Sequence, residues 1–158
     1  TGKGRLILAE TVSLLGQRLS GLVPAEAAET DLHREWRDAE NEIYDGSVNP
    51  RLDWKPDALK KSLENSGWRT LSWQVQAFQT PTRIPARQLD EWFRIDSDTP
   101  TYGYRLQKIL NSEKLAEIQR MLMQHAADRV LPWKSTRLFL SVSPQTRKPE
   151  ETLGMDES

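Results

Sequence analysis

Two short and almost wholly apolar runs lie near opposite ends of this 158-residue chain, and they constrain its fold more than any other feature. The first covers residues 5–9 and the second covers residues 137–142. A run that is apolar at nearly every position is typical of a strand covered on both faces, as in parallel or mixed sheets. The sequence therefore predicts an α/β fold in which both runs are interior strands.

A third strand is predicted over residues 71–77, where apolar and polar side chains alternate. Leu71, Trp73 and Val75 fall on one side of this segment, so one face is expected to be buried and the other solvated. That pattern is typical of an edge strand. An interior strand that comes last in the chain must then insert between the other two and run antiparallel to both. The expected spatial order is first, third, second.

Helical spacing of apolar side chains predicts the remaining elements. Residues 12–23 are expected to form one helix with Gln17, Arg18 and Ser20 facing water, and Pro81 and Pro85 are expected to end the second strand. The last residues, 144–158, are polar and predict a flexible tail after a domain over residues 1–143. The other predicted helices cover residues 25–44 with a densely charged surface, a segment from Pro56 to a stop at Asn65-Ser66-Gly67, a short segment with Leu89 and Phe93, a segment from Tyr102 to Leu110, and a segment capped by Ser112 with the stripe Leu115, Ile118, Leu122 and Ala126.

The composition excludes several classes of protein. The 22 Lys and Arg residues nearly balance the 23 Asp and Glu residues, which argues against nucleic-acid binding driven by bulk positive charge. Without cysteine the chain has no disulfide, no thiolate zinc site and no thiol nucleophile. No apolar run approaches the roughly 20 residues that cross a bilayer. We therefore expect a cytoplasmic protein with no membrane partner.

Two segments resemble a known family. Residues 2–10, GKGRLILAE, resemble the "PGGRLVLAE" approach to the fifth strand of class I S-adenosylmethionine-dependent methyltransferases. Residues 59–68, LKKSLENSGW, resemble the last helix of that family and its turn into strand six. The final strand of that family is antiparallel and lies between strands five and six. The resemblance implies the C-terminal half of a Rossmann-like methyltransferase sheet with extra helices.

A narrower resemblance involves residues 88–93 (QLDEWF) and 131–136 (LPWKST). They are similar to a C-terminal extension in some bacterial AAA+ ATPases of the replication-associated recombination (RarA/MgsA) family. This implies an appended domain in a multidomain ATPase that acts in DNA recombination and replication. The methyltransferase family's cofactor glycines and ribose-binding acid would precede Thr1, and the Walker residues of the ATPase are absent from this sequence. We therefore expect no cofactor-binding residue here. S-adenosylmethionine, ATP and DNA would be bound only by the remainder of the parent chain.

Five residues form the candidate substrate site. Ligands of open α/β sheets bind at the carboxyl ends of the parallel strands. That edge would hold Glu10 and Thr11 after the first strand, Thr80 after the second and, because the third strand is reversed, Trp133 and Lys134 at its beginning. A carboxylate, an aromatic plane and an ammonium would then converge on one cleft. In the alternative interpretation Trp133 packs the end of the sheet and Glu10 forms a structural ion pair.

Metal chemistry is not expected. The only histidines are His33, expected to be solvated on a charged helix, and His125, expected to be half-buried beside an apolar stripe. Neither has a second ligand at helical spacing that would complete a zinc site. Two other functions stay open. One is a non-catalytic module that binds a protein partner through the charged helices 25–44 and 101–129. The other is the tail of a free-standing small-molecule methyltransferase.

Overall fold

The computed structural model describes residues 4–44 and 54–145. Its three strands form one sheet in the order β1–β3–β2, and β3 is antiparallel to both neighbours. The predicted strand order and directions are therefore confirmed. The strands are β1 (Leu6–Thr11), β2 (Trp68–Arg83) and β3 (Val130–Pro144).

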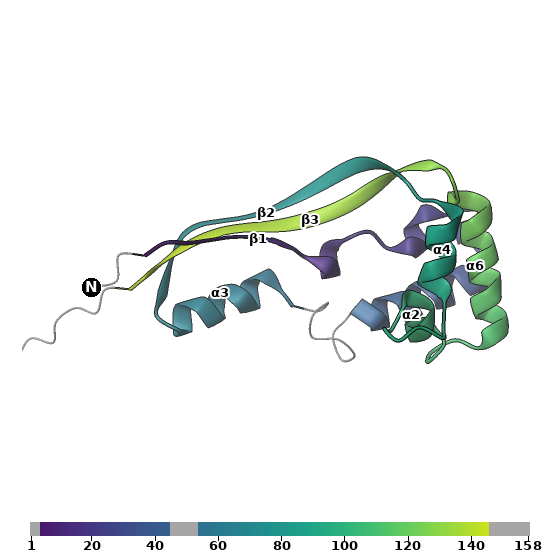
Figure 1. Cartoon of the computed structure of the whole chain (residues 1–158), viewed down its shortest axis with the longest axis horizontal. Coiled ribbons are helices and arrows are strands. Elements are labelled where there is room, and N and C mark those ends of the chain that lie inside the picture. Colours follow the sequence, from purple (N-terminus) through teal and green to yellow (C-terminus); the bar gives the residue numbers. More distant parts are fainter. Residues whose placement is uncertain (1–3, 45–53, 146–158) are drawn as a thin grey trace, which may run out of the picture.

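The molecule has two ends that are joined by a long ribbon of β2 and β3 (Figure 1). At one end β1 completes the sheet and α3 lies against one face; we call this end the sheet lobe. At the other end the remaining α-helices gather beside the end of β2 and the start of β3; we call residues 19–44 and 84–129 the helical lobe. The helices are α1 (Ala25–Ala28), α2 (Asp31–Tyr44), α3 (Pro56–Asn65), α4 (Ala86–Phe93), α5 (Tyr102–Leu106) and α6 (Ser112–Ala126).

The core of the sheet lobe is built on alternate residues of β3. Leu138, Leu140 and Val142 are buried, because successive side chains of a strand point to opposite faces and these three face α3. The start and stop expected for α3 are confirmed. Pro56 occupies its first turn, and Gly67 follows its end with a φ of 82°, a conformation that costs a residue with a side chain roughly 1 kcal/mol.

The helical lobe has its own core, in which the stripe predicted for α6 is fully or nearly fully buried. Asn111, not Ser112, caps this helix, since its side chain accepts a hydrogen bond from the backbone N–H of Lys114 at 2.9 Å. The helix predicted over residues 25–44 is divided into α1 and α2. Thr30 accepts a hydrogen bond from the backbone N–H of His33, which starts a new helix at this point. The helix from Tyr102 ends at Leu106 instead of Leu110.

The prediction of one helix over residues 12–23 is wrong. The segment forms two short 3₁₀ helices, η1 (Ser13–Leu15) and η2 (Leu19–Leu22), and Ser20 is buried instead of facing water. The physical reason is a buried carboxylate. Glu40 accepts hydrogen bonds from the backbone N–H groups of Leu19 and Ser20, at 2.7 and 3.1 Å, and so satisfies the start of η2.

The second strand is longer than predicted, because β2 continues through Pro81 to Arg83. Pro81 lies opposite Pro132 of β3. Neither proline has an N–H group, so this pair occupies a non-hydrogen-bonded position of the antiparallel ladder and removes none of its bonds. A bulge between Thr70 and Ser72 also shifts the register, and Leu71 is 45% exposed at this point. Pro144 still belongs to β3, and the rest of the predicted tail after Gln145 lies outside the described residues.

The first strand is not interior in this structure, which corrects the expectation for residues 5–9. β1 lies at the edge of the sheet, and Ile7 is 70% exposed. In Figure 1 α3 lies below the sheet and the other described helices lie at its far end, so along β1 no described helix covers the face opposite α3. β1 therefore combines an interior-type sequence with an edge position.

Candidate functional site

The five predicted site residues do not meet in one cleft. Thr80 and Trp133 are direct partners across β2 and β3, whereas Glu10 pairs with Leu138 and Thr11 pairs with Arg137. Leu138 is four residues beyond Lys134 on β3, which corresponds to about 13 Å along a strand. The reason is that β2 and β3 extend past the end of β1, so the end of β1 does not coincide with the start of β3.

Trp133 and Lys134 also separate from each other, because consecutive residues of a strand point to opposite faces. Trp133 packs against Trp92 of α4 with ring centroids 6.1 Å apart. This agrees with the alternative interpretation, in which Trp133 packs the end of the sheet. Lys134 instead lines a different pocket.

This pocket, which we call the β2–η1 pocket, has a volume of about 500 Å³. It lies beyond the end of β1, on the face of the sheet that carries Leu138 and α3. Three elements build it: the η1 segment, the middle of β2 and the first half of β3. Its lining residues are Leu14, Leu15, Gly16, Arg18, Val75, Ala77, Lys134 and Thr136.

The wall formed by the η1 segment is fixed by hydrogen bonds. The hydroxyl of Thr136 donates to the backbone oxygen of Leu15 at 2.9 Å, and the guanidinium of Arg18 donates to the backbone oxygen of Leu14 at 2.9 Å. Arg18 also stacks over the ring of Tyr44, 3.8 Å from its centroid.

The backbone N–H of Lys134 donates to the side-chain oxygen of Gln17 at 3.1 Å, while the Lys134 residue itself is exposed. These contacts hold the η1 segment against β3.

A second cluster of polar groups lies inside the helical lobe. Trp36 donates its indole N–H to the hydroxyl of Tyr102 at 2.7 Å, close to the buried carboxylate of Glu40. Burial raises the pKa of Tyr102 well above its usual value of 10.0, and the negative charge of Glu40 adds to this effect. Burial likewise raises the pKa of Tyr44, again with a contribution from Glu40. Both tyrosines therefore stay protonated to a higher pH than a tyrosine in water.

His33 belongs to the same cluster, so the expectation that it is solvated is wrong. Its ring nitrogen Nε2 lies 2.8 Å from the backbone oxygen of Ser20, and the residue is 7% exposed. His125 is half-buried, as expected. Within the described residues no buried side-chain polar atom lacks a hydrogen-bond partner. The hydrogen bonds of this cluster hold η2 against α2 and link α2 to α5.

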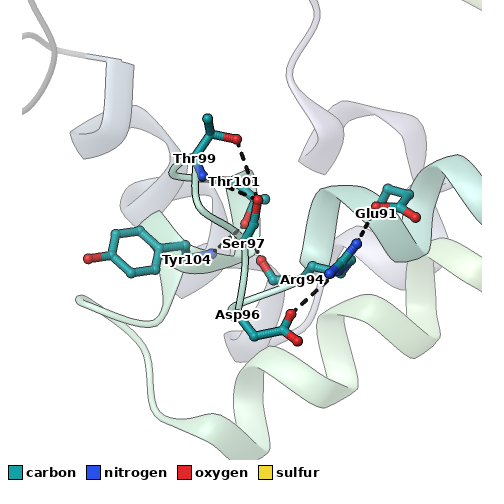
Figure 2. Close-up of polar contacts among 7 residues, drawn as sticks. All are labelled: Glu91, Arg94, Asp96, Ser97, Thr99, Thr101 and Tyr104. Carbon is teal, nitrogen blue, oxygen red and sulfur yellow. Dashed lines mark hydrogen bonds and ion pairs between the residues drawn. The ribbon is translucent and has the colours of Figure 1, made fainter.

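The turn between α4 and α5 holds a third group of polar side chains (Figure 2). Arg94 donates to Glu91 at 3.1 Å and to Asp96 at 3.4 Å, and Thr101 accepts from the backbone N–H of Tyr104 at 3.1 Å. These contacts close the loop on itself and cap α5, which is the role of a structural turn. Across residues 4–44 and 54–145 no group of three or more His, Asp or Glu side chains is arranged to hold a metal ion.

The residues that sequence reasoning missed left recognisable signals. Glu40 lies four residues after Trp36 and three before Ile43, which places an acid in the middle of an apolar helical stripe. Gly16 falls inside the segment predicted as a helix, where a glycine is unfavourable by about 1 kcal/mol. The first signal points to a buried carboxylate and the second to the loop that forms the pocket wall.

Comparison with known proteins gives no relationship: no protein-family model, no curated protein and no solved structure matches this chain. Among the helices in the described part of the chain, none combines the length and the apolarity needed to cross a membrane.

Proposed function

We propose that this chain is the C-terminal part of a methyltransferase-like Rossmann sheet, of the kind appended to bacterial AAA+ recombination ATPases. The observation that carries this proposal is the contrast between the two edges of the sheet. The strand order supports the same proposal. The order β1–β3–β2 with β3 reversed is the order of the last three strands in that family.

The outer edge of β2 carries the features that natural proteins use to prevent pairing with further strands. It has a bulge between Thr70 and Ser72, a proline at position 81, and arginines at 69 and 83. Bulges, prolines and charged side chains are the usual protections of a true edge. The sheet is therefore expected to end at β2.

The outer edge of β1 lacks this protection. Its sequence is LILAET, with one charged residue, no proline and no bulge in its pairing with β3. Leu6 is 41% exposed and Ile7 is 70% exposed. An unprotected apolar strand at an edge is a template for a further strand. These features support a sheet that continues past β1.

The face opposite α3 supports the same proposal. Phe78 of β2 and Phe139 of β3 lie edge-to-face on it, with ring centroids 6.4 Å apart, and Phe78 is 38% exposed. Rossmann-like sheets carry helices on both faces. The rest of the parent domain would cover these aromatic rings as well as β1.

In this proposal the chain completes the sheet of an appended domain in a cytoplasmic protein that acts in DNA recombination and replication. The preceding parts of the parent would supply the ATP site, the contacts with DNA and any site for S-adenosylmethionine. The chain itself would hold neither nucleotide nor methyl donor.

The test is methyl transfer by the complete protein from radiolabelled S-adenosylmethionine, with and without DNA, beside a calorimetric titration of this chain alone. We expect no binding of S-adenosylmethionine by the chain alone. Labelled product from the complete protein would support an active methyltransferase domain. Micromolar binding by the chain alone, or a parent sequence without further strands before Thr1, would contradict the proposal.

The second candidate is a non-catalytic interaction module. It is favoured by the separation of Glu10 and Thr11 from Trp133 and Lys134, which leaves the sheet edge without the convergence that a substrate site needs. In that case the complete protein transfers no methyl group, while deletion of residues 1–143 from it weakens its association with a protein partner.

A further inference from the structure

We propose that the β2–η1 pocket binds a small amphiphilic anion, meaning a molecule with an apolar body and a single carboxylate. The inference does not rest on the family relationship proposed above, because it uses only the shape, lining and charge of this pocket.

The charge of the pocket lining is one-sided. Lys134 and Arg18 both line the pocket, and no acidic side chain does. Within the described residues neither cation forms an ion pair. Arg18 bonds only neutral backbone oxygens and the face of Tyr44, so these contacts leave its positive charge in place. Glu10 shares this face of the sheet at the level of Leu138, but it does not line the pocket.

The rest of the lining is mainly apolar. Leu14, Leu15, Val75 and Ala77 contribute apolar side chains to the lining, and Leu15 and Val75 are 46% and 41% exposed. Exposed leucine and valine side chains that line a concave surface gain free energy when an apolar ligand removes them from water. The pocket is shallow and open to solvent, and its volume of about 500 Å³ leaves room for a small apolar body on these side chains.

The two cations have different expected roles. Arg18 is held in place by its stacking on Tyr44 and by the backbone of the η1 segment, so it contributes a fixed positive field. The Lys134 backbone is held by Gln17, while its exposed side chain can move to meet a carboxylate. A flexible ammonium and a fixed guanidinium that line the same pocket favour a ligand with one anionic group. The apolar walls favour a ligand whose remaining part is apolar.

The experiment compares three probes with the same apolar body: naphthalene-2-carboxylate, naphthalene-2-methanol and naphthalene-2-methylammonium. Each is titrated into the whole chain, and binding is followed by amide chemical-shift changes. We expect the carboxylate to bind, with shifts gathered at residues 14–18, 75–77 and 134–136. The alcohol should bind about tenfold more weakly because it lacks the charge-assisted contact, and the ammonium should bind more weakly still.

Lys134→Gln should remove most of the preference for the carboxylate over the alcohol, and Lys134→Arg should retain it. Lys61→Gln on the exposed surface of α3 removes the same charge away from the pocket and should leave the preference unchanged. Val75→Glu provides a second test, since a carboxylate on the wall should weaken the anion and strengthen the ammonium probe. An unchanged amide spectrum before titration shows that each variant is folded.

The proposal is overturned if the three probes bind equally, if none binds, or if Lys134→Gln keeps the full preference. Shifts that gather outside the β2–η1 pocket would overturn it as well. Methyl transfer by the parent protein has no bearing on these results, so failure of the proposed function and failure of this inference are distinguishable.

Discussion

Among single residues, Glu40 has the largest expected effect on stability. It is completely buried and accepts two backbone hydrogen bonds from η2. Glu40→Ala leaves both N–H groups without partners in the interior, and we expect a loss of about 3 kcal/mol in the free energy of unfolding. Glu40→Gln keeps one acceptor oxygen and should lose less. Urea denaturation measures both.

The matched control is Glu42→Ala, which removes an exposed carboxylate from the same helix and should change the free energy of unfolding by less than about 0.5 kcal/mol. Equal stability of the Glu40→Ala and Glu42→Ala variants would show that the buried carboxylate does not hold η2.

Tyr102 should make the protein sensitive to alkali. Its pKa is raised above 10.0 in the folded state, chiefly by burial, whereas in the unfolded chain it ionises near that value. Below pH 10 both states are protonated and the stability is complete. As the pH rises above 10, the unfolded state loses the proton first, so the free energy of unfolding falls.

Tyr102→Phe tests this directly. The variant loses about 1 kcal/mol at neutral pH, because the Trp36 N–H has no acceptor, but its stability should fall less steeply above pH 10. The measurement is the free energy of unfolding from pH 8 to pH 11, with Tyr104→Phe as the control. A slope above pH 10 identical to that of the unmodified chain would refute this explanation.

At the scale of elements, the contact between α4 and α5 depends on Gly103. A β-carbon at this position would lie 2.5 Å from the backbone oxygen of Phe93 and 2.7 Å from its Cα. Backbone atoms cannot rotate away, so α5 must move. We expect Gly103→Ala to cost about 2 kcal/mol and to lower the midpoint of thermal unfolding. Gly4→Ala, where nothing lies within 4 Å, should leave the midpoint unchanged. Equal midpoints would indicate that the two helices are not in close contact.

The elements differ in how far the sequence predicts them. β3 and α6 are predictable because Leu138, Leu140 and the stripe from Leu115 to Ala126 are buried within the described residues, so local periodicity and tertiary packing agree. The split of residues 12–23 into η1 and η2 depends on Glu40, which lies 21 and 20 positions from its partners Leu19 and Ser20 in the sequence. Local patterns contain no information about such a partner.

The candidate site also combines a feature that local sequence patterns predict with one that depends on distant partners. The spatial order of the strands follows from which of them is interior, so it can be predicted. The relative lengths of the strands cannot, because the extension of β2 through Pro81 depends on its pairing with Pro132. That extension is what moves Trp133 and Lys134 away from Glu10. The strand order could therefore be predicted from the sequence, whereas the separation of Glu10 from Trp133 and Lys134 could not.

In the whole molecule, the two lobes differ in how completely their apolar surfaces are covered (Figure 1). The helical lobe is closed, since its core is packed and its buried polar groups are paired. The sheet lobe is open along β1 and over the face with Phe78 and Phe139, and the β2–η1 pocket lies between the two. We therefore expect the helical lobe to contribute most of the free energy of unfolding. We expect the sheet lobe to form the contacts with further protein segments.

Amide hydrogen exchange distinguishes a β1 that is an interior strand of a larger sheet from a β1 that ends the sheet. Exchange is measured for residues 6–11 and for the outer edge of β2, in this chain alone and in the longer protein that we propose contains it. An interior position for β1 predicts that β1 exchanges markedly more slowly in the longer protein, while the edge of β2 exchanges at the same rate in both. Equally fast exchange of β1 in the two proteins, or new protection along β2 instead, would contradict it.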